Sequence, residues 1–174
     1  MVSEAGAMNV FFLLKDATGA EQQHQQPSGT TTTATSPRSS AGFELVTPPL
    51  DGTILPGVTR ASLLSLAAAR SASGKEPSLS PLRVTERPLT VSELSSAASS
   101  GRLLEVFCSG TAAAVMPVQS IARAGGAGEM FAERYVPGSG ASLSSRLFAE
   151  LQDIQYGRTA HDGWSVRVDA DGPA

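Results

Sequence analysis

The sequence predicts an α+β fold, because short apolar segments typical of buried strands alternate with three segments of helical periodicity. The chain has 174 residues and a hydrophobic fraction of 41%, which suffices for the core of one domain of ordinary size. The expected order along the chain is two strands, a helix, a strand, a helix, two strands, a helix and a strand.

Strands are expected where β-branched, aromatic or leucine side chains cluster in short runs. The clearest run is residues 9–14, NVFFLL, which is typical of a buried strand and is followed by turn-forming residues at 15–19. Residues 43–46, FELV, are expected to return as its hairpin partner. Further strands are expected at 82–87, 103–107, 112–118 and 164–168, with a small-residue turn at 108–111 and a Gly/Ala loop at 122–128.

Helices are expected at residues 58–70, 92–99 and 143–155. The first and third place apolar residues three or four positions apart, on one helix face. The second begins with the pair Thr90 and Glu93, which has the spacing of a capping box. The apolar residues that define the two longer helices are Leu63, Leu64, Leu66, Ala67, Leu143, Leu147, Leu151 and Ile154.

Residues 20–42 are rich in Gln, Ser and Thr and nearly devoid of large apolar side chains. Such a stretch buries too little area to offset its ordering entropy, so we expect a disordered low-complexity insert, with a recognition tract as the alternative. The expected organisation is one domain over residues 1–168 that contains this insert, followed by a tail at 169–174.

Composition narrows the range of partners. The formal net charge is −3 with scattered basic residues, so neither a nucleic acid nor an anionic membrane is expected as partner. No apolar run approaches the roughly 20 residues of a membrane helix, and the first residues lack the pattern of a signal peptide. His24, His161 and Cys108 do not make a zinc site.

A helix start after Pro56-Gly57 is the first candidate for chemistry. The N–H groups of Val58 and Thr59 lack intrahelical acceptors, and with the positive end of the helix dipole they suit a phosphate. Gly57 permits a close backbone approach to a ligand. An ordinary helix start is the alternative.

A second candidate is the small-residue turn Gly110-Thr111-Ala112 at the end of a strand, where successive backbone amides can form an anion-binding concavity. A plain tight turn is the alternative. Glu4, close to the chain start, is a third candidate whose ordinary interpretation is a solvated carboxylate.

These candidates belong to four sequence blocks, at residues 3–9, 45–60, 101–118 and 154–161, which read SEAGAMN, LVTPPLDGTILPGVTR, GRLLEVFCSGTAAAVMPV and IQYGRTAH. In this order they resemble the fold type IV, or class IV, pyridoxal-phosphate aminotransferases, and specifically the eukaryotic-type branched-chain amino acid aminotransferases. The resemblance spans nearly the whole chain, apart from loops at 20–42, 71–81 and 122–137. It implies most of the large C-terminal domain of such an enzyme, a fold shared with D-amino acid aminotransferase.

The resemblance implies roles for the candidate residues. Glu4 would face the pyridine nitrogen of pyridoxal 5'-phosphate, and Leu55 would pack on its ring. Gly57, Val58, Thr59 and Thr111 would bind its phosphate side. The amides of Thr111 and Ala112 would hold the substrate carboxylate. These groups should therefore surround one space, with Glu4 facing the gap between the two amide pairs.

The chain departs from the family mainly by lacking its Schiff-base lysine, which lies upstream of the glutamate block. Only Lys15 and Lys75 are present, and neither matches the motif, so no catalytic residue is assigned and the chain alone is expected to be inactive. Ala7 stands where a threonine is common. Ala113 and Met116 replace the redox cysteines of some animal members.

Other reactive side chains are expected to have ordinary roles. Solvated or structural roles are expected for Arg60, Arg102, Arg158 and His161. Cys108 follows a buried strand and is expected to act as a small hydrophobe.

The implied activity is transfer of an amino group between leucine, isoleucine or valine and 2-oxoglutarate, and the complete protein is expected to be a homodimer. Two alternatives remain. One is another fold type IV enzyme, such as a D-amino acid aminotransferase or an aminodeoxychorismate lyase. The other is a non-enzymatic truncated paralogue that binds partners. Cytoplasm, mitochondria and plastids all remain open as the compartment.

Overall fold

The computed structural model describes residues 1–16, 42–75, 77–122, 129–132, 142–161 and 163–166. The low-complexity insert expected at 20–42 lies outside the described residues, except for Gly42. The tail expected at 169–174 lies outside them as well. Among the described residues, no helix combines the length and apolar character needed to cross a membrane.

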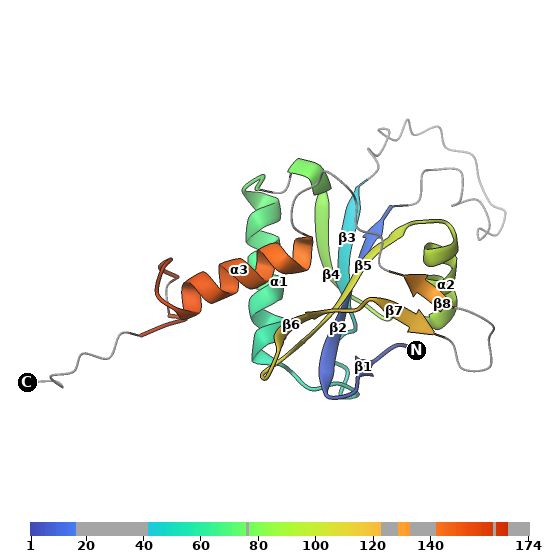
Figure 1. The fold of residues 1–174 in the computed structure, drawn as a ribbon, viewed down its shortest axis with the longest axis horizontal. Helices are drawn as coiled ribbons and strands as arrows, with labels where there is room; N and C mark the ends of the chain where they lie inside the picture. Colours follow the sequence, from blue (N-terminus) through green and yellow to red (C-terminus); the bar gives the residue numbers. More distant parts are fainter. Residues whose placement is uncertain (17–41, 76, 123–128, 133–141, 162, 167–174) are drawn as a thin grey trace, which may run out of the picture.

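A mixed sheet forms the centre of the fold (Figure 1), with strand order β4-β3-β2-β5-β6 and β1 paired to β2. Its strands are β1 (Glu4–Ala5), β2 (Met8–Lys15), β3 (Phe43–Thr47), β4 (Leu82–Glu86), β5 (Leu103–Gly110) and β6 (Ala114–Pro117). Neighbouring strands run antiparallel except β3 and β4, which are parallel. The hairpin expected between residues 9–14 and 43–46 is therefore confirmed.

Two helices cover one face of the sheet, and a third helix covers the other (Figure 1). Helices α1 (Val58–Ala72) and α3 (Leu143–Gln155) pack on the first face, and α2 (Val91–Ser99) on the second. All three were expected, and the bounds of α3 agree with the expectation at both ends. A short 3-10 helix, η1 (Pro77–Leu79), precedes β4.

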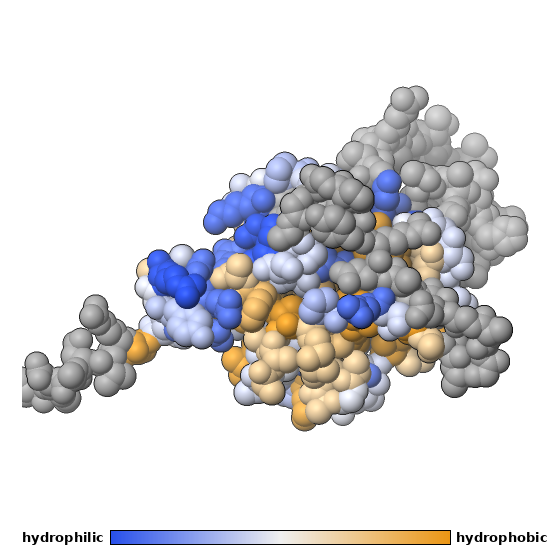
Figure 2. Space-filling model, in the orientation of Figure 1, coloured by the Kyte–Doolittle hydropathy of each residue, from blue (hydrophilic) through white to orange (hydrophobic). Residues whose placement is uncertain are grey.

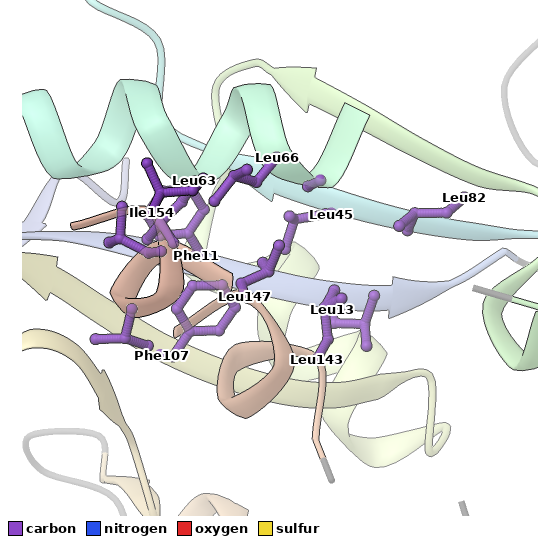
Figure 3. Close-up of a cluster of buried hydrophobic side chains, with 13 residues drawn as sticks. Phe11, Leu13, Leu45, Leu63, Leu66, Leu82, Phe107, Leu143, Leu147 and Ile154 are labelled. Atoms are coloured by element: carbon purple, nitrogen blue, oxygen red, sulfur yellow. The ribbon is translucent and has the colours of Figure 1, made fainter. Parts of the chain in front are cut away.

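The alternation of side chains along β2 and β5 divides the core into two clusters. Phe11 and Phe107 stack with ring centroids 4.9 Å apart on the face covered by α1 and α3, which Figure 3 shows in close-up. Val10, Phe12 and Cys108 point to the opposite face, where α2 covers them. This two-sided burial explains why the run NVFFLL contains no alternating polar residues.

Two local expectations were wrong. Residues 108–110 continue β5 instead of forming a turn, because Cys108 and Ser109 pair with β2 on one side and with β6 on the other. Two short strands, β7 (Ser120–Ala122) and β8 (Glu129–Ala132), form a separate sheet on either side of the Gly/Ala loop expected at 122–128, of which residues 123–128 lie outside the described residues. Residues 164–166 form no strand, since Trp164 instead packs on the ring of His161.

Candidate functional site

Three of the four sequence blocks meet at one edge of the sheet, the lower edge in Figure 1. The β1–β2 hairpin, the start of α1 and the β5–β6 turn all lie there. β5 runs antiparallel to β2, so the end of β5 lies beside the beginning of β2. Figure 2 shows apolar residues gathered over the same edge.

Glu4 is held in place by the short strand β1. A tight turn with Gly6 at φ 66° folds β1 back onto β2, so that Glu4 pairs with Asn9. Its Oε1 accepts hydrogen bonds from the Leu55 N–H at 2.7 Å and from the Asn9 Nδ2 at 3.3 Å. Its Oε2 has no hydrogen-bond partner among the described residues, so one carboxylate oxygen remains available to a ligand.

The start of α1 combines backbone donors with exposed apolar side chains. Gly57 is the N-cap residue at φ −65° and ψ 131°; it makes no side-chain cap, and the first turn contains no acidic residue. Ile54 is buried and anchors the preceding loop, whereas Leu55 and Val58 are 65% and 83% exposed. The amides of Val58 and Thr59 therefore stay candidates for binding an anion at a helix start that no side chain caps.

The β5–β6 turn contributes a third set of backbone groups. Gly110 pairs with Ala114, which leaves Thr111, Ala112 and Ala113 as the turn, and the side chains of Thr111 and Ala112 are exposed. Ala114 has a φ of 51°, a left-handed conformation that is uncommon for a residue other than glycine. Gly110 is closely packed as well, since a Cβ atom there would lie 3.1 Å from Met8 Cγ.

Asn9 joins these pieces, although no role was expected for it from the sequence. Its Nδ2 donates to Leu55 O at 3.0 Å as well as to Glu4, and a Cβ atom added to Gly57 would collide with its Oδ1. Its cross-strand partner is Ser109, two residues before Thr111. The signal that could have revealed it is an amide side chain that opens an otherwise apolar strand.

Of the arginines set aside in the sequence analysis, Arg60 has a structural role. It is only 3% exposed, although it lies in the first turn of α1, and it donates to Pro48 O at 2.8 Å and pairs with Glu86 at 2.5 Å. Arg158 pairs with Asp153 at the surface.

The remaining reactive side chains also have ordinary contacts. Arg102 donates to Ser100 Oγ. His161 is half-buried beside Trp164. Cys108 is buried among apolar residues, and burial raises the pKa of its thiol, as expected of a small hydrophobe.

The two lysines lie far from this edge. Lys15 ends β2, six residues beyond Asn9, which is about 20 Å along an extended strand. Lys75 follows α1 at the end opposite to Val58, and the 15 residues of the helix span roughly 22 Å. Neither amine lies near Glu4 or the start of α1.

A cavity of about 360 Å³ lies on the α2 side of the sheet and adjoins Glu4. Its other walls are almost entirely apolar and include Val10, Phe12, Leu94 and Cys108. It offers no cluster of donors comparable to the edge where the three blocks meet.

Comparison with known proteins identifies relatives. The chain is 38% identical over 165 residues to the cytosolic branched-chain-amino-acid aminotransferase of Saccharomyces cerevisiae, covering 94% of this chain and 36% of that protein. It is 45% identical over 128 residues to the mitochondrial enzyme of Rattus norvegicus, covering 72% of this chain and 28% of that protein. The chain thus spans about a third of the length of the curated relatives it matches.

A solved structure of a putative branched-chain amino acid aminotransferase from Thermotoga maritima matches 88% of this chain and 37% of its own, with 25% identity and a TM-score of 0.48. The family model of class IV aminotransferases matches residues 1–121, which include three of the four blocks identified above. The α+β fold and the order of those blocks agree with this match. The chain belongs to the class IV aminotransferase family.

Proposed function

We propose that this edge of the sheet binds pyridoxal 5'-phosphate. The family generally depends on this cofactor. The observation that carries the proposal is the hydrogen bond from Leu55 N–H to Glu4, which joins the carboxylate to the segment that leads into α1. One ligand with a phosphate at one end and a ring nitrogen at the other would engage both groups.

The residues present fit such a ligand. The amides of Val58 and Thr59, with the turn at Thr111, would hold the phosphate. Leu55 offers an exposed apolar side chain to a flat ring, and Glu4 keeps Oε2 for a ring nitrogen. The small side chain of Ala112 leaves its backbone N–H accessible to a substrate carboxylate.

The chemistry follows from the charge of Glu4. A carboxylate next to a ring nitrogen favours the protonated ring, because an opposite charge at close range stabilises the cation. When bound, the cofactor withdraws electrons from the substrate's α-carbon and carries the amino group. The role of Glu4 is to hold the proton on that nitrogen, and the role of the amides is orientation.

For the complete protein we propose branched-chain amino acid aminotransferase activity, with 2-oxoglutarate as the amino acceptor and a homodimeric assembly. The support is that relatives with this name match 72–94% of the chain. The chain alone should not catalyse the reaction, because Lys15 and Lys75 lie at the far ends of β2 and α1. Both cytosolic and mitochondrial relatives match, so neither compartment is preferred.

The test uses pyridoxamine 5'-phosphate, which contains the phosphate and the ring but needs no lysine amine to bind. It is titrated into the isotope-labelled chain while backbone amide shifts are followed by NMR, which also detects weak binding. We expect the largest shifts at Val58, Thr59 and Thr111. Shifts confined to other parts of the chain would contradict the proposed site.

A proline substitution sharpens the test, because proline at the first helical position removes an N–H donor without disturbing the helix. Val58→Pro should weaken binding about 10-fold, the value of one hydrogen bond to a charged group. Gly57 already has the extended ψ of 131° that a following proline requires.

The matched control is Val91→Pro at the same position of α2, where Thr90 has a ψ of 152°. This variant should bind as the unmodified chain does. Equal weakening by both variants would show that the effect does not come from the start of α1. In a separate assay, leucine turnover by the chain above the rate of the free cofactor would contradict its expected inactivity.

A further inference from the structure

Asn9 is one of the few polar side chains buried in the sheet; it is 5% exposed at the start of β2. An amide nitrogen carries two hydrogens, and both are used here, one toward Glu4 Oε1 and one toward Leu55 O. Because Leu55 N–H also donates to Glu4 Oε1, the three residues form a closed ring of hydrogen bonds. The two hydrogen bonds donated by Asn9 are part-buried, whereas the one from Leu55 N–H lies at the surface.

The other side of the same amide touches the turn that leads into α1. A Cβ atom at Gly57 would collide with Asn9 Oδ1, so the amide and the backbone of Gly57 are in tight contact. The backbone of Asn9 pairs with Ser109, which precedes Gly110 and the turn at Thr111. Asn9 thus contacts the carboxylate and the helix start, and pairs with the strand that carries the turn.

We propose that Asn9 is a positioning residue that fixes Glu4 relative to the start of α1, so that one ligand meets both. This inference rests on the cofactor site proposed above. Asn9 is only 5% exposed, so it offers almost no surface to the ligand and acts through Glu4 and Leu55. Its amide also suits the place chemically. A second carboxylate there would repel Glu4, and an apolar side chain would remove one of the two donors to Leu55 O and leave only the Gly57 N–H.

The experiment is a double-substitution cycle in the 174-residue chain, with pyridoxamine 5'-phosphate affinity measured by NMR titration. Asn9→Leu, which is neutral and of comparable size, should weaken binding about 10-fold by releasing Glu4 and the Leu55 segment. In a chain that already contains Glu4→Gln, the same change should cost less than about 3-fold, because the residue through which Asn9 acts has been altered. Equal losses in both backgrounds would overturn the proposal.

Inorganic phosphate and Thr47→Val serve as controls. Phosphate alone engages no ring-nitrogen partner, so Asn9→Leu should weaken its binding less than that of pyridoxamine 5'-phosphate. Thr47→Val removes a neighbouring buried hydrogen bond to Val10 O without touching Glu4 or Leu55. It should leave affinity for pyridoxamine 5'-phosphate unchanged, and a loss equal to that of Asn9→Leu would indicate a merely structural effect.

A second measurement needs no ligand and separates this inference from the proposed function. In the free chain, the amide hydrogen of Leu55 should exchange at least 10-fold faster in Asn9→Leu, while the amides of Phe11 and Leu13 exchange unchanged. Unchanged exchange at Leu55 would overturn the positioning role, whatever the ligand does. Faster exchange in a chain that does not bind pyridoxamine 5'-phosphate would instead reject the cofactor site.

Discussion

The two helices on the same face of the sheet begin in opposite ways. At the start of α3, Glu105 accepts from the N–H groups of Leu143 and Ser144, both at 3.0 Å, and Ser142 Oγ accepts from Ser145 N–H. Glu105 is 6% exposed, so this carboxylate is a built-in anion at a buried helix end. At the start of α1 the cap residue is Gly57, which has no side chain to offer.

The difference shows how one fold uses the same backbone chemistry for structure and for binding. Both helix starts present N–H groups without intrahelical acceptors, and both favour negative charge. In α3 the chain supplies that charge from β5, which makes the junction part of the core. At the start of α1 no side chain makes a cap, which is why we propose a ligand there. Helix α2, capped by Thr90, lies between these extremes.

The largest expected effect comes from removing the built-in anion. Glu105→Ala should lower the free energy of unfolding by about 3 kcal/mol, because two buried N–H groups would lose their acceptor. Denaturant unfolding followed by circular dichroism measures it. Glu105→Gln, which keeps one acceptor oxygen, should cost about half as much, and a loss below about 1 kcal/mol for Glu105→Ala would mean that water reaches the start of α3.

A second prediction concerns pH and the network that leads to α2. Arg87 pairs with Glu44 at 2.9 Å and with Glu93 in the first turn of α2 at 2.8 Å. The hydrogen bond from Arg87 holds the pKa of Glu44 below its ordinary value of 4.5. A lowered pKa in the folded state means that the pairing stabilises the fold above the unfolded pKa and is lost as pH falls through the folded pKa.

Glu44→Gln should therefore cost about 1–2 kcal/mol of unfolding free energy at pH 7. The gap between the unmodified chain and the variant should narrow as pH falls below about 4.5. Urea unfolding at a series of pH values measures this gap. A gap that stays constant down to pH 3 would show that packing, and not charge, accounts for the effect of Glu44.

A third prediction compares two hydroxyl caps. Thr90 Oγ1 accepts from Glu93 N–H at 3.0 Å, so Thr90→Ala should cost about 1 kcal/mol. Ser142→Ala should cost less, because Glu105 already satisfies two amides at that helix start. Thermal unfolding of both variants decides the order, and an equal or larger loss for Ser142→Ala would contradict the dominance of Glu105 in capping α3.

The elements predicted correctly from the sequence are those in which burial sets the spacing of the apolar side chains. Some of these elements are buried on one face and others on both faces. β2, α1 and α3 are examples, since NVFFLL and the leucine spacing leave no other regular structure that buries them. The end of β5 was predicted wrongly because Cys108 and Ser109 are small residues typical of a turn, and only pairing with two distant strands keeps them extended. The segment that begins at Trp164 was predicted to be a strand from its composition alone.

The same limit applies to the candidate site. Its blocks could be identified because each is contiguous in sequence. The roles of Asn9 and Glu105 could not be predicted, because their partners Leu55 and Leu143 lie 46 and 38 residues away in the sequence. A polar residue inside an apolar strand signals that a partner exists, but the sequence does not identify the partner.

The smallest expected effect comes from giving α1 the anion that α3 already has. Val58 is 83% exposed at the first position of the helix, so Val58→Asp adds a negative charge near the N-terminal amides without disturbing the core. The chain should gain about 0.5 kcal/mol of unfolding free energy from the helix dipole, and this gain should shrink in high salt.

The same carboxylate would repel a phosphate, so pyridoxamine 5'-phosphate should bind more weakly while stability rises. Val91→Asp, at the same position of the already capped α2, is the control and should leave binding unchanged. A Val58→Asp chain that binds the ligand normally would mean that the open start of α1 is not where the phosphate sits.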